Sequence, residues 1–243
     1  MNILGIESSG LVASAALLQD DTITALATVN NHLTHSQTLL PLVEDVRRMA
    51  DFAWNDLDAI AVSAGPGSFT GLRIGSSTAK GLAQALDVPI VPVPTLDALA
   101  FGYGVCDGVV CPIMDARRNQ VYAGVYRIRG NQDHTQILES VLDNEAVAMD
   151  DLLAKLEELG ETVHFLGDGV PVQKERIAAF FTERGISFDF APPHRSRQSA
   201  DGVAVLGAVY YGQGKAVPAR EHAPIYLRQS QAERERAQRM AQK

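Results

Sequence analysis

Residues 65–75 read Gly-Pro-Gly-Ser-Phe-Thr-Gly-Leu-Arg-Ile-Gly, and this stretch is the most informative part of the chain. It follows an apolar run at 58–63 and precedes a helical pattern that extends to about Leu86, so a strand, a glycine-rich turn and a helix are predicted. Glycines at such a turn permit close backbone approach and leave helix N–H groups open to an anion. The same glycines also serve an ordinary tight turn, and the stretch matches neither of the usual glycine-rich phosphate-binding patterns.

The segments on either side of this turn complete an α/β pattern. Short apolar or alternating runs predict an antiparallel meander of three strands, at 2–6, 12–18 and 22–29. A helical pattern follows at 37–50, with Ser36 as its expected N-cap. The run at 88–93 contains Pro89 and Pro92 and is therefore expected to form a short or edge strand.

The second half of the sequence repeats this plan at the level of pattern. Strands are predicted at 109–114, 120–128, 135–142 and 163–166, and helices at 150–159, from 170 to about 181, and at 199–212. A duplicated meander followed by alternating helices and strands is the core of the actin/Hsp70-like (ASKHA) architecture. The fold expected is α/β, with two such lobes of mixed β-sheet flanked by helices. The N-terminal lobe, with the dimerisation helices, would be 1–105, the C-terminal lobe 106–227, and a polar flexible tail 228–243.

Composition limits the possible functions. The chain has 243 residues and a formal net charge of −8, so its surface as a whole repels phosphate backbones, although a local basic patch is compatible with this charge. The two cysteines, Cys106 and Cys111, are too few for a disulfide framework and are expected to be reduced. No signal peptide or long apolar segment is evident, and a cytoplasmic protein with no membrane span is expected.

Candidate site residues fall at strand ends and glycine turns. Glu7 and Asp115 occupy matching turns of the two halves and could form a paired-carboxylate site across a cleft, or each could cap its own turn. The turn at 167–169 resembles an adenosine-side loop, and a plain turn explains it equally well. Arg117 and Arg118 at a hairpin tip could contact phosphate or be solvated. A vestigial nucleotide or phosphate site would use Glu7, Ser8, Gly65, Gly67, Ser68, Asp115, Gly167 and Gly169.

Two helices carry more apolar and small residues than contact with a sheet requires. Such surplus surface on the helices at 37–50 and 70–86 predicts an association face, unless another part of the chain covers it. The predicted partner interface consists of Leu39, Leu40, Val43, Met49, Leu72, Ile74, Gly75, Ala79, Leu82 and Ala85.

Four segments in series carry a family resemblance: residues 3–9, 65–75 with 79–82, 114–122 and 223–228. In this order they resemble the TsaB (YeaZ) family of bacterial tRNA threonylcarbamoyladenosine biosynthesis proteins, and the match runs from residue 3 to residue 228. The resemblance implies a non-catalytic scaffold or activator required for threonylcarbamoylation of adenosine 37 (t6A) in tRNAs that read codons starting with A. It would act with the transferase TsaD, bound as a heterodimer through the N-terminal lobe, and with the ATPase TsaE.

The resemblance also sets expectations for ligands and partners. No cofactor is expected on the chain alone, with ATP or ADP bound only within the complex, and tRNA is expected only through the complex. The isolated chain is expected to form a homodimer. The TsaD type carries a His-x-x-x-His pair of metal ligands, whereas the corresponding residues 94–103 contain no histidine, so no metal site is expected.

Two enzymatic alternatives remain open from the sequence. An actin-like ATP-dependent small-metabolite kinase would use Glu7, the 65–71 loop and the 167–169 turn for ATP. A metal-dependent peptidase would need several converging metal ligands, and the six histidines are scattered along the chain.

Overall fold

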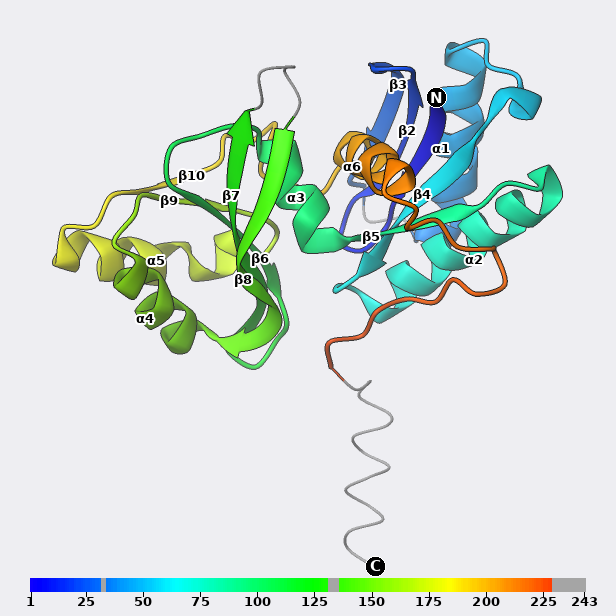
Figure 1. Cartoon of the computed structure of the whole chain (residues 1–243). Helices are drawn as coiled ribbons and strands as arrows, with labels where there is room; N and C mark the ends of the chain where they lie inside the picture. Colours follow the sequence, from blue (N-terminus) through cyan, green and yellow to red (C-terminus); the bar gives the residue numbers. More distant parts are fainter. Residues whose placement is uncertain (32–33, 131–135, 229–243) are drawn as a thin grey trace, which may run out of the picture.

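The computed structural model describes residues 1–31, 34–130 and 136–228, which form two five-stranded mixed sheets (Figure 1). The first sheet has the order β3-β2-β1-β4-β5, formed by β1 (Asn2–Glu7), β2 (Ala13–Gln19), β3 (Thr22–Val29), β4 (Ala59–Gly65) and β5 (Ile90–Pro94). The second has the order β10-β9-β6-β7-β8, formed by β6 (Val109–Asp115), β7 (Gln120–Gly130), β8 (Gln136–Ala148), β9 (Val163–Leu166) and β10 (Phe188–Phe190).

The two sheets have the same topology. In each, three consecutive strands pair antiparallel, and the first strand then pairs in parallel with a fourth, which pairs in parallel with a fifth. This duplication confirms the two-lobed actin/Hsp70-like α/β fold predicted from the sequence.

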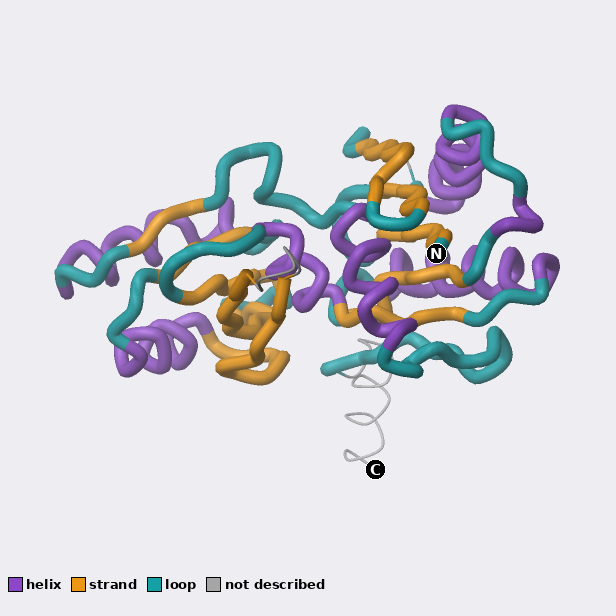
Figure 2. Tube along the Cα trace, turned by 45° about the horizontal axis from the view of Figure 1, so that its top comes forward, coloured by secondary structure: helices purple, strands orange, loops and turns teal. Residues whose placement is uncertain are grey.

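Helices cover both faces of each sheet (Figures 1 and 2). The outer helices are α1 (His35–Met49) and α2 (Phe69–Leu86) on the first sheet, and α4 (Met149–Leu159) and α5 (Val170–Arg184) on the second. Between the sheets lie α3 (Thr95–Tyr103) and α6 (Ala200–Gly212), and a short 3-10 turn (Trp54–Asp56) precedes β4. Among the described residues, none of these helices is both long and apolar enough to span a membrane.

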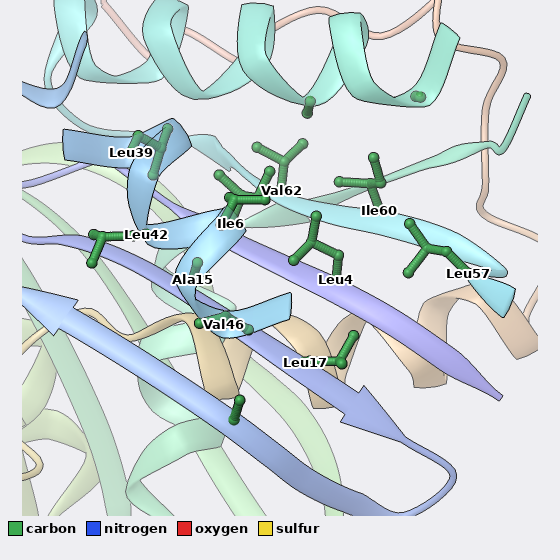
Figure 3. Close-up of a cluster of buried hydrophobic side chains, with 14 of the residues drawn as sticks. Leu4, Ile6, Ala15, Leu17, Leu39, Leu42, Val46, Leu57, Ile60 and Val62 are labelled. Atoms are coloured by element: carbon green, nitrogen blue, oxygen red, sulfur yellow. The ribbon is translucent and has the colours of Figure 1, made fainter. Parts of the chain in front are cut away.

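The first sheet is buried on both faces. Leu4 and Ile6 of β1 point toward the outer helices, where they meet Leu39 and Val46 of α1 (Figure 3). Ile3, which directly precedes Leu4 in the sequence, instead belongs to the cluster around α6. Alternate side chains of one strand therefore enter two cores, which explains its continuous apolar sequence.

Helix α6 packs on the first sheet rather than on the second. A Cβ atom on Gly207 would lie 2.3 Å from Cβ of Ala61, so the helix approaches β4 at backbone distance. The chain then runs along β5, where Val217 bridges Ile90, and Ile225 N donates to Ala64 O at 2.6 Å.

This packing differs from the division expected from the sequence, which assigned all of 106–227 to the second lobe. Helix α6 is apolar on all sides, so its sequence predicts burial without indicating which sheet it covers. Of the tail expected at 228–243, only Arg228 lies within the described residues.

Several element boundaries also differ from expectation. Helix α1 begins at His35 with Thr34 as the N-cap instead of Ser36, and it contains Pro41. Strand β8 continues to Ala148, beyond the predicted end at residue 142. Helix α3 and the short strand β10 were not predicted, and β5 is an edge strand as expected.

Candidate functional site

A cleft of about 560 Å³ lies between the lobes at the carboxyl ends of four strands. Strands β1 and β4 run parallel in one sheet, as do β6 and β9 in the other, so their final residues and following loops meet at this edge. The cleft is lined by Ser9, Gly10, Leu11, Pro66, Gly67, Ser68, Phe69, Thr70, Met114, Asp115, Ala116, Arg117, Tyr122, Asp168, Val172, Ile225, Tyr226, Leu227 and Arg228.

The glycine-rich turn after β4 packs directly against the turn after β1. Ser68 N donates to Ser9 O at 2.6 Å, and a Cβ atom on Gly67 would lie 2.3 Å from the same oxygen. A Cβ atom on Gly71 would lie 2.1 Å from Ser8 O. Gly67 and Gly71 therefore leave room for the turn after β1. That turn already accepts, through Ser9 O, the N–H of Ser68, which is the N-cap residue of α2.

Ser8 and Gly65 also serve contacts within the first lobe. Ser8 is buried, and its Oγ donates to Gly71 O at 2.9 Å. Gly65 has a positive φ of 114°, and a Cβ atom there would lie 2.3 Å from Ile225 O. Neither residue lines the cleft, in contrast to Gly67 and Ser68 of the same predicted set.

Glu7 lies outside the cleft lining and is 1% exposed. Its Oε1 accepts hydrogen bonds from Ser9 N at 2.5 Å and from Ser9 Oγ at 2.6 Å. Burial raises the pKa of Glu7 to about 7, hydrogen bonds from Ser9 and Ser63 oppose this rise, and the nearby charge of Asp168 adds to it.

Asp115 is exposed and lines the cleft, and its Oδ1 accepts from Arg117 N at 2.7 Å. Glu7 and Asp115 thus each accept the N–H of the residue two positions later. This arrangement is that of the turn-capping alternative, and only Asp115 of the two carboxylates reaches the cleft.

The loop after β9 contributes its central carboxylate to the cleft. Gly169 N donates to Ile113 O at 3.0 Å, and Gly167 N donates to Ser196 O at 3.0 Å, so both glycines serve backbone packing. Asp168 Oδ1 accepts from Asp115 N and its Oδ2 from Gln198 Nε2, both at 3.3 Å. Burial raises the pKa of Asp168 above its ordinary value.

Sequence reasoning missed several cleft residues. Asp168 stood between two glycines at a strand end, which is a usable signal for a loop carboxylate, but only the flanking glycines were selected. Phe69 and Tyr226 are far apart in the sequence, and only folding brings the centres of their rings to a distance of 4.6 Å. Arg228 reaches Ala116 O with its Nη1 at 2.8 Å for the same reason.

The predicted association face contains both surface and core residues. Leu40, Met49 and Ala85 are exposed, and Ile74 and Leu82 are half-buried. The other predicted members are buried within the first lobe and do not belong to an outer surface: Leu39, Val43, Leu72, Gly75 and Ala79. Leu39, Val43 and Ala79 belong to the core cluster between these helices and the sheet, so their apolar character serves the chain's own core.

The described residues bring together no group of three or more histidine, cysteine, aspartate or glutamate side chains able to hold a metal ion. His35, one of the histidines in these ranges, has its Nε2 2.9 Å from Gly10 O.

Comparison with known proteins identifies relatives over nearly the whole chain. A family model described as TsaD, tRNA N6-adenosine threonylcarbamoyltransferase, matches residues 30–236. The tRNA threonylcarbamoyladenosine biosynthesis protein TsaB of Bacillus subtilis is 36% identical over 233 residues, which cover 96% of each chain. TsaB of Haemophilus influenzae is 29% identical over 235 residues, which cover 94% of each chain.

A solved structure supports the same relationship. A protein from Pseudomonas aeruginosa, described as uncharacterized with similarity to peptidase YeaZ, aligns with a TM-score of 0.73 and 26% identity over 93% of this chain and 99% of that chain. The chain therefore belongs to the TsaB (YeaZ) family, which shares the TsaD-type family model.

Proposed function

We propose that this protein acts in threonylcarbamoyladenosine biosynthesis as a non-catalytic scaffold or activator. In this role it supports the transfer of threonylcarbamoyl to adenosine 37 in tRNAs that read codons starting with A, with TsaD as the transferase and TsaE as a further partner. The observation that carries the proposal is the 36% identity to a TsaB protein over 96% of both chains.

The geometry of the cleft supports a role without chemistry of its own. Glu7, the acid that an actin-like kinase would use, is enclosed and hydrogen-bonded within its own turn. The carbonyl oxygen of Ser9 accepts the N–H of Ser68, where a kinase would present this donor to a phosphate. Both features favour a structural use of the motifs over ATP-dependent catalysis.

The exposed part of the α1 and α2 surface is the proposed partner face. It consists of Leu40, Met49 and Ala85 with the half-buried Ile74 and Leu82. TsaD would dock on this face in the complex, and a second copy of the chain would occupy it in the isolated protein. Exposed apolar side chains beside small residues allow helices to approach closely, which suits helix-to-helix contact between related folds. Nucleotide, as ATP or ADP, would bind within the assembled complex.

Reconstitution tests the proposal directly. Purified chain, TsaD and TsaE are combined with threonylcarbamoyl-adenylate and an unmodified tRNA that reads a codon starting with A, and t6A is measured by mass spectrometry of nucleosides. Product is expected with the full set and is expected to be lost when the chain is omitted or supplied alone. Turnover by the single chain, or full activity without it, would contradict the scaffold role.

A further inference from the structure

The arginines of this acidic chain divide into two groups. Thirteen lie within the described residues, and seven of these form ion pairs with carboxylates: Arg47, Arg48, Arg127, Arg129, Arg176, Arg184 and Arg220. Of the six described arginines without such a pair, Arg117 and Arg228 line the inter-lobe cleft. Two more lie beside the lining: Arg73 packs on the lining residue Phe69, and Arg118 follows Arg117 in the same turn. A cluster of unneutralised guanidinium groups on a protein of net charge −8 indicates an anionic ligand at this place.

The turn that carries two of these arginines is held in an uncommon backbone conformation. Arg117, Arg118 and Asn119 have φ values of 61°, 56° and 61°, in the left-handed region that side-chain-bearing residues rarely adopt in succession. Hydrogen bonds fix the turn, from Arg117 N to Asp115 Oδ1 at 2.7 Å and from Arg176 Nη1 to Asn119 Oδ1 at 2.8 Å. Such strain persists where the surroundings enforce it, and here it presents two exposed arginines in a fixed orientation.

An aromatic stack faces this turn across the cleft lining. The Arg73 guanidinium lies 3.9 Å from the ring centre of Phe69, and the Phe69 and Tyr226 rings are 4.6 Å apart and tilted by 32°. Tyr226 is 40% exposed, so part of its ring is free to contact another planar group. Arg228 joins this side of the cleft to the second lobe through its hydrogen bond to Ala116 O.

The acids of the cleft do not cancel this charge. Asp115 and Asp168 are the carboxylates in its lining, and each accepts hydrogen bonds from neighbouring backbone or amide groups. The lining therefore holds two arginines and two aspartates, and Arg73 and Arg118 beside it add two further positive charges at the mouth of the cleft.

The geometry points to an extended polyanion rather than a free nucleotide. The turn after β1 fills the gaps above Gly67 and Gly71, so the glycine turn does not offer an open phosphate cradle. The arginines are instead spread along the mouth of the cleft, beside an exposed aromatic ring. Single-stranded nucleic acids are bound in this way, with phosphates on arginines and an unstacked base on an aromatic side chain.

We propose that this rim, defined as Arg73, Arg117, Arg118, Tyr226 and Arg228, contacts a single-stranded stretch of tRNA within the assembled complex. Phosphates would lie on Arg117, Arg118 and Arg228, and an unstacked base would stack on Tyr226. The inference rests on the proposed function, in which tRNA is the substrate of the complex. The net negative charge of the chain explains why the rim would act only beside a partner that also binds the RNA.

The test compares two double variants of the chain in the reconstituted complex. Arg117→Asn with Arg118→Asn removes two rim charges, and asparagine tolerates the left-handed backbone that the turn requires. The matched control is Arg129→Asn with Arg220→Asn, which removes the same charge from exposed, ion-paired positions elsewhere. Affinity for a labelled tRNA transcript is measured by fluorescence anisotropy over a series of salt concentrations, and assembly with TsaD is measured separately.

The rim variant is expected to bind tRNA about tenfold more weakly, and its plot of log affinity against log salt should be shallower by roughly 1.4, as the loss of two phosphate contacts to a single strand requires. The control should stay within about twofold of the unaltered protein, since its arginines are assigned no RNA contact. Tyr226→Leu should weaken binding without changing the salt slope, because stacking involves no counterion release.

Equal tRNA affinity of the rim variant and the control would overturn the inference. It would also be overturned if the rim variant lost affinity for ATP and not for tRNA, because the site would then hold a nucleotide. These outcomes are distinct from failure of the proposed function, in which the unaltered chain would not support t6A formation at all.

Discussion

The two lobes share one topology, yet the ion pairs on their outer helices differ. In the second lobe, ion pairs join α4 and α5 to each other and to β8: Asp150–Arg176, Glu157–Arg184 and Glu145–Lys155. In the first lobe, the ion pairs of α1 stay within the helix: Glu44–Arg47 and Asp45–Arg48. Helix α2 has only two charged residues among its 18, Arg73 and Lys80.

The proposed partner face lies on the lobe whose α1 ion pairs stay within one helix. Ion pairs join α4 to α5, and such charged surfaces are suited to solvent. The α1 and α2 helices instead expose Leu40, Met49 and Ala85, which leaves apolar surface for contact with a partner in the proposed complex. The turns after the first strand of each lobe also differ, because Glu7 is enclosed and Asp115 is exposed. The two lobes thus share one topology, while their outer surfaces and the turns after their first strands differ.

The largest effect is expected where the two turns of the first lobe touch. Gly71→Ala would place a Cβ atom 2.1 Å from Ser8 O, a backbone atom that cannot rotate away, and should cost more than about 3 kcal/mol of folding free energy. In the second lobe, Gly169→Ala meets Ile113 O at 3.0 Å and should cost less. Thermal unfolding followed by circular dichroism measures both, and equal melting temperatures for the two variants would show that the turns are not packed differently.

A second prediction concerns the enclosed turn carboxylate, Glu7, and the pH dependence of stability. Burial raises the pKa of Glu7 to about 7 from an ordinary value of 4.5, so the folded state holds this proton more tightly than the unfolded chain. The contribution to stability is therefore complete below pH 4.5 and is lost as pH rises through 7. The loss is on the order of 3 kcal/mol.

Glu7→Gln keeps an acceptor oxygen for Ser9 and removes this titration. Its free energy of unfolding should match that of the unaltered protein below pH 4.5 and exceed it increasingly as the pH rises toward 7, above which the difference levels off. Urea or thermal unfolding at several pH values measures the difference, and parallel profiles for Glu7→Gln and the unaltered chain would refute the assignment.

The outer faces can be compared through two exposed apolar residues of matched exposure. Leu40 on α1 is 54% exposed, and Ile137 on β8 is 51% exposed. Leu40→Asp should weaken TsaD binding about thirtyfold, or about 2 kcal/mol, because it puts a charge into the proposed contact. Ile137→Asp should leave binding unchanged.

Both variants should fold normally, since each side chain is exposed in the isolated chain. Calorimetry gives the affinities, and sedimentation of the isolated chain shows whether Leu40→Asp also shifts a homodimer toward monomer. Equal weakening by both substitutions would place the partner face elsewhere.

Local sequence patterns predicted most strands and the outer helices, because alternation and 3.6-residue spacing arise from one-sided burial. Helix α3 was missed, since its sequence Thr-Leu-Asp-Ala-Leu-Ala-Phe-Gly-Tyr is apolar almost throughout and shows no clear period. The apolar sequence of helix α6 predicts that the helix is buried. It does not indicate which of the two sheets the helix covers, because that depends on how the chain returns to the first lobe.

The candidate sites were predicted less completely than the fold. Strand-end residues such as Gly67, Ser68 and Asp115 do reach one cleft, because parallel strands bring their carboxyl ends together. Leu39 and Ala79 were assigned to an outer face although they lie in the core, because composition alone does not separate the two stripes of an amphipathic helix. Contacts such as Phe69 with Tyr226 arise only from tertiary folding.

The smallest expected effect concerns two glycines, one in each lobe, that both have room for a side chain but differ in backbone conformation. Gly81 lies within α2, Gly160 follows α4 as its C-cap, and a Cβ atom on either would have no heavy atom within 4 Å. Gly81→Ala should stabilise the chain by about 1 kcal/mol, because alanine loses less entropy in a helix interior. Gly160→Ala should destabilise it by about the same amount, because φ there is +64° and an alanine pays for the left-handed conformation.

The melting temperature should therefore rise for Gly81→Ala and fall for Gly160→Ala, although both positions have room for the added methyl group. Partner binding can also be compared between the two variants, because Gly81 is a small exposed position on α2, four residues before Ala85 of the proposed partner face. If a helix of TsaD packs closely there, the added methyl group should weaken binding in the variant whose fold it stabilises, while Gly160→Ala should leave binding unchanged. A stabilised Gly81→Ala variant with unaltered affinity would restrict the contact to the part of the face around Leu40 and Ala85, and destabilisation of both variants would refute the backbone argument.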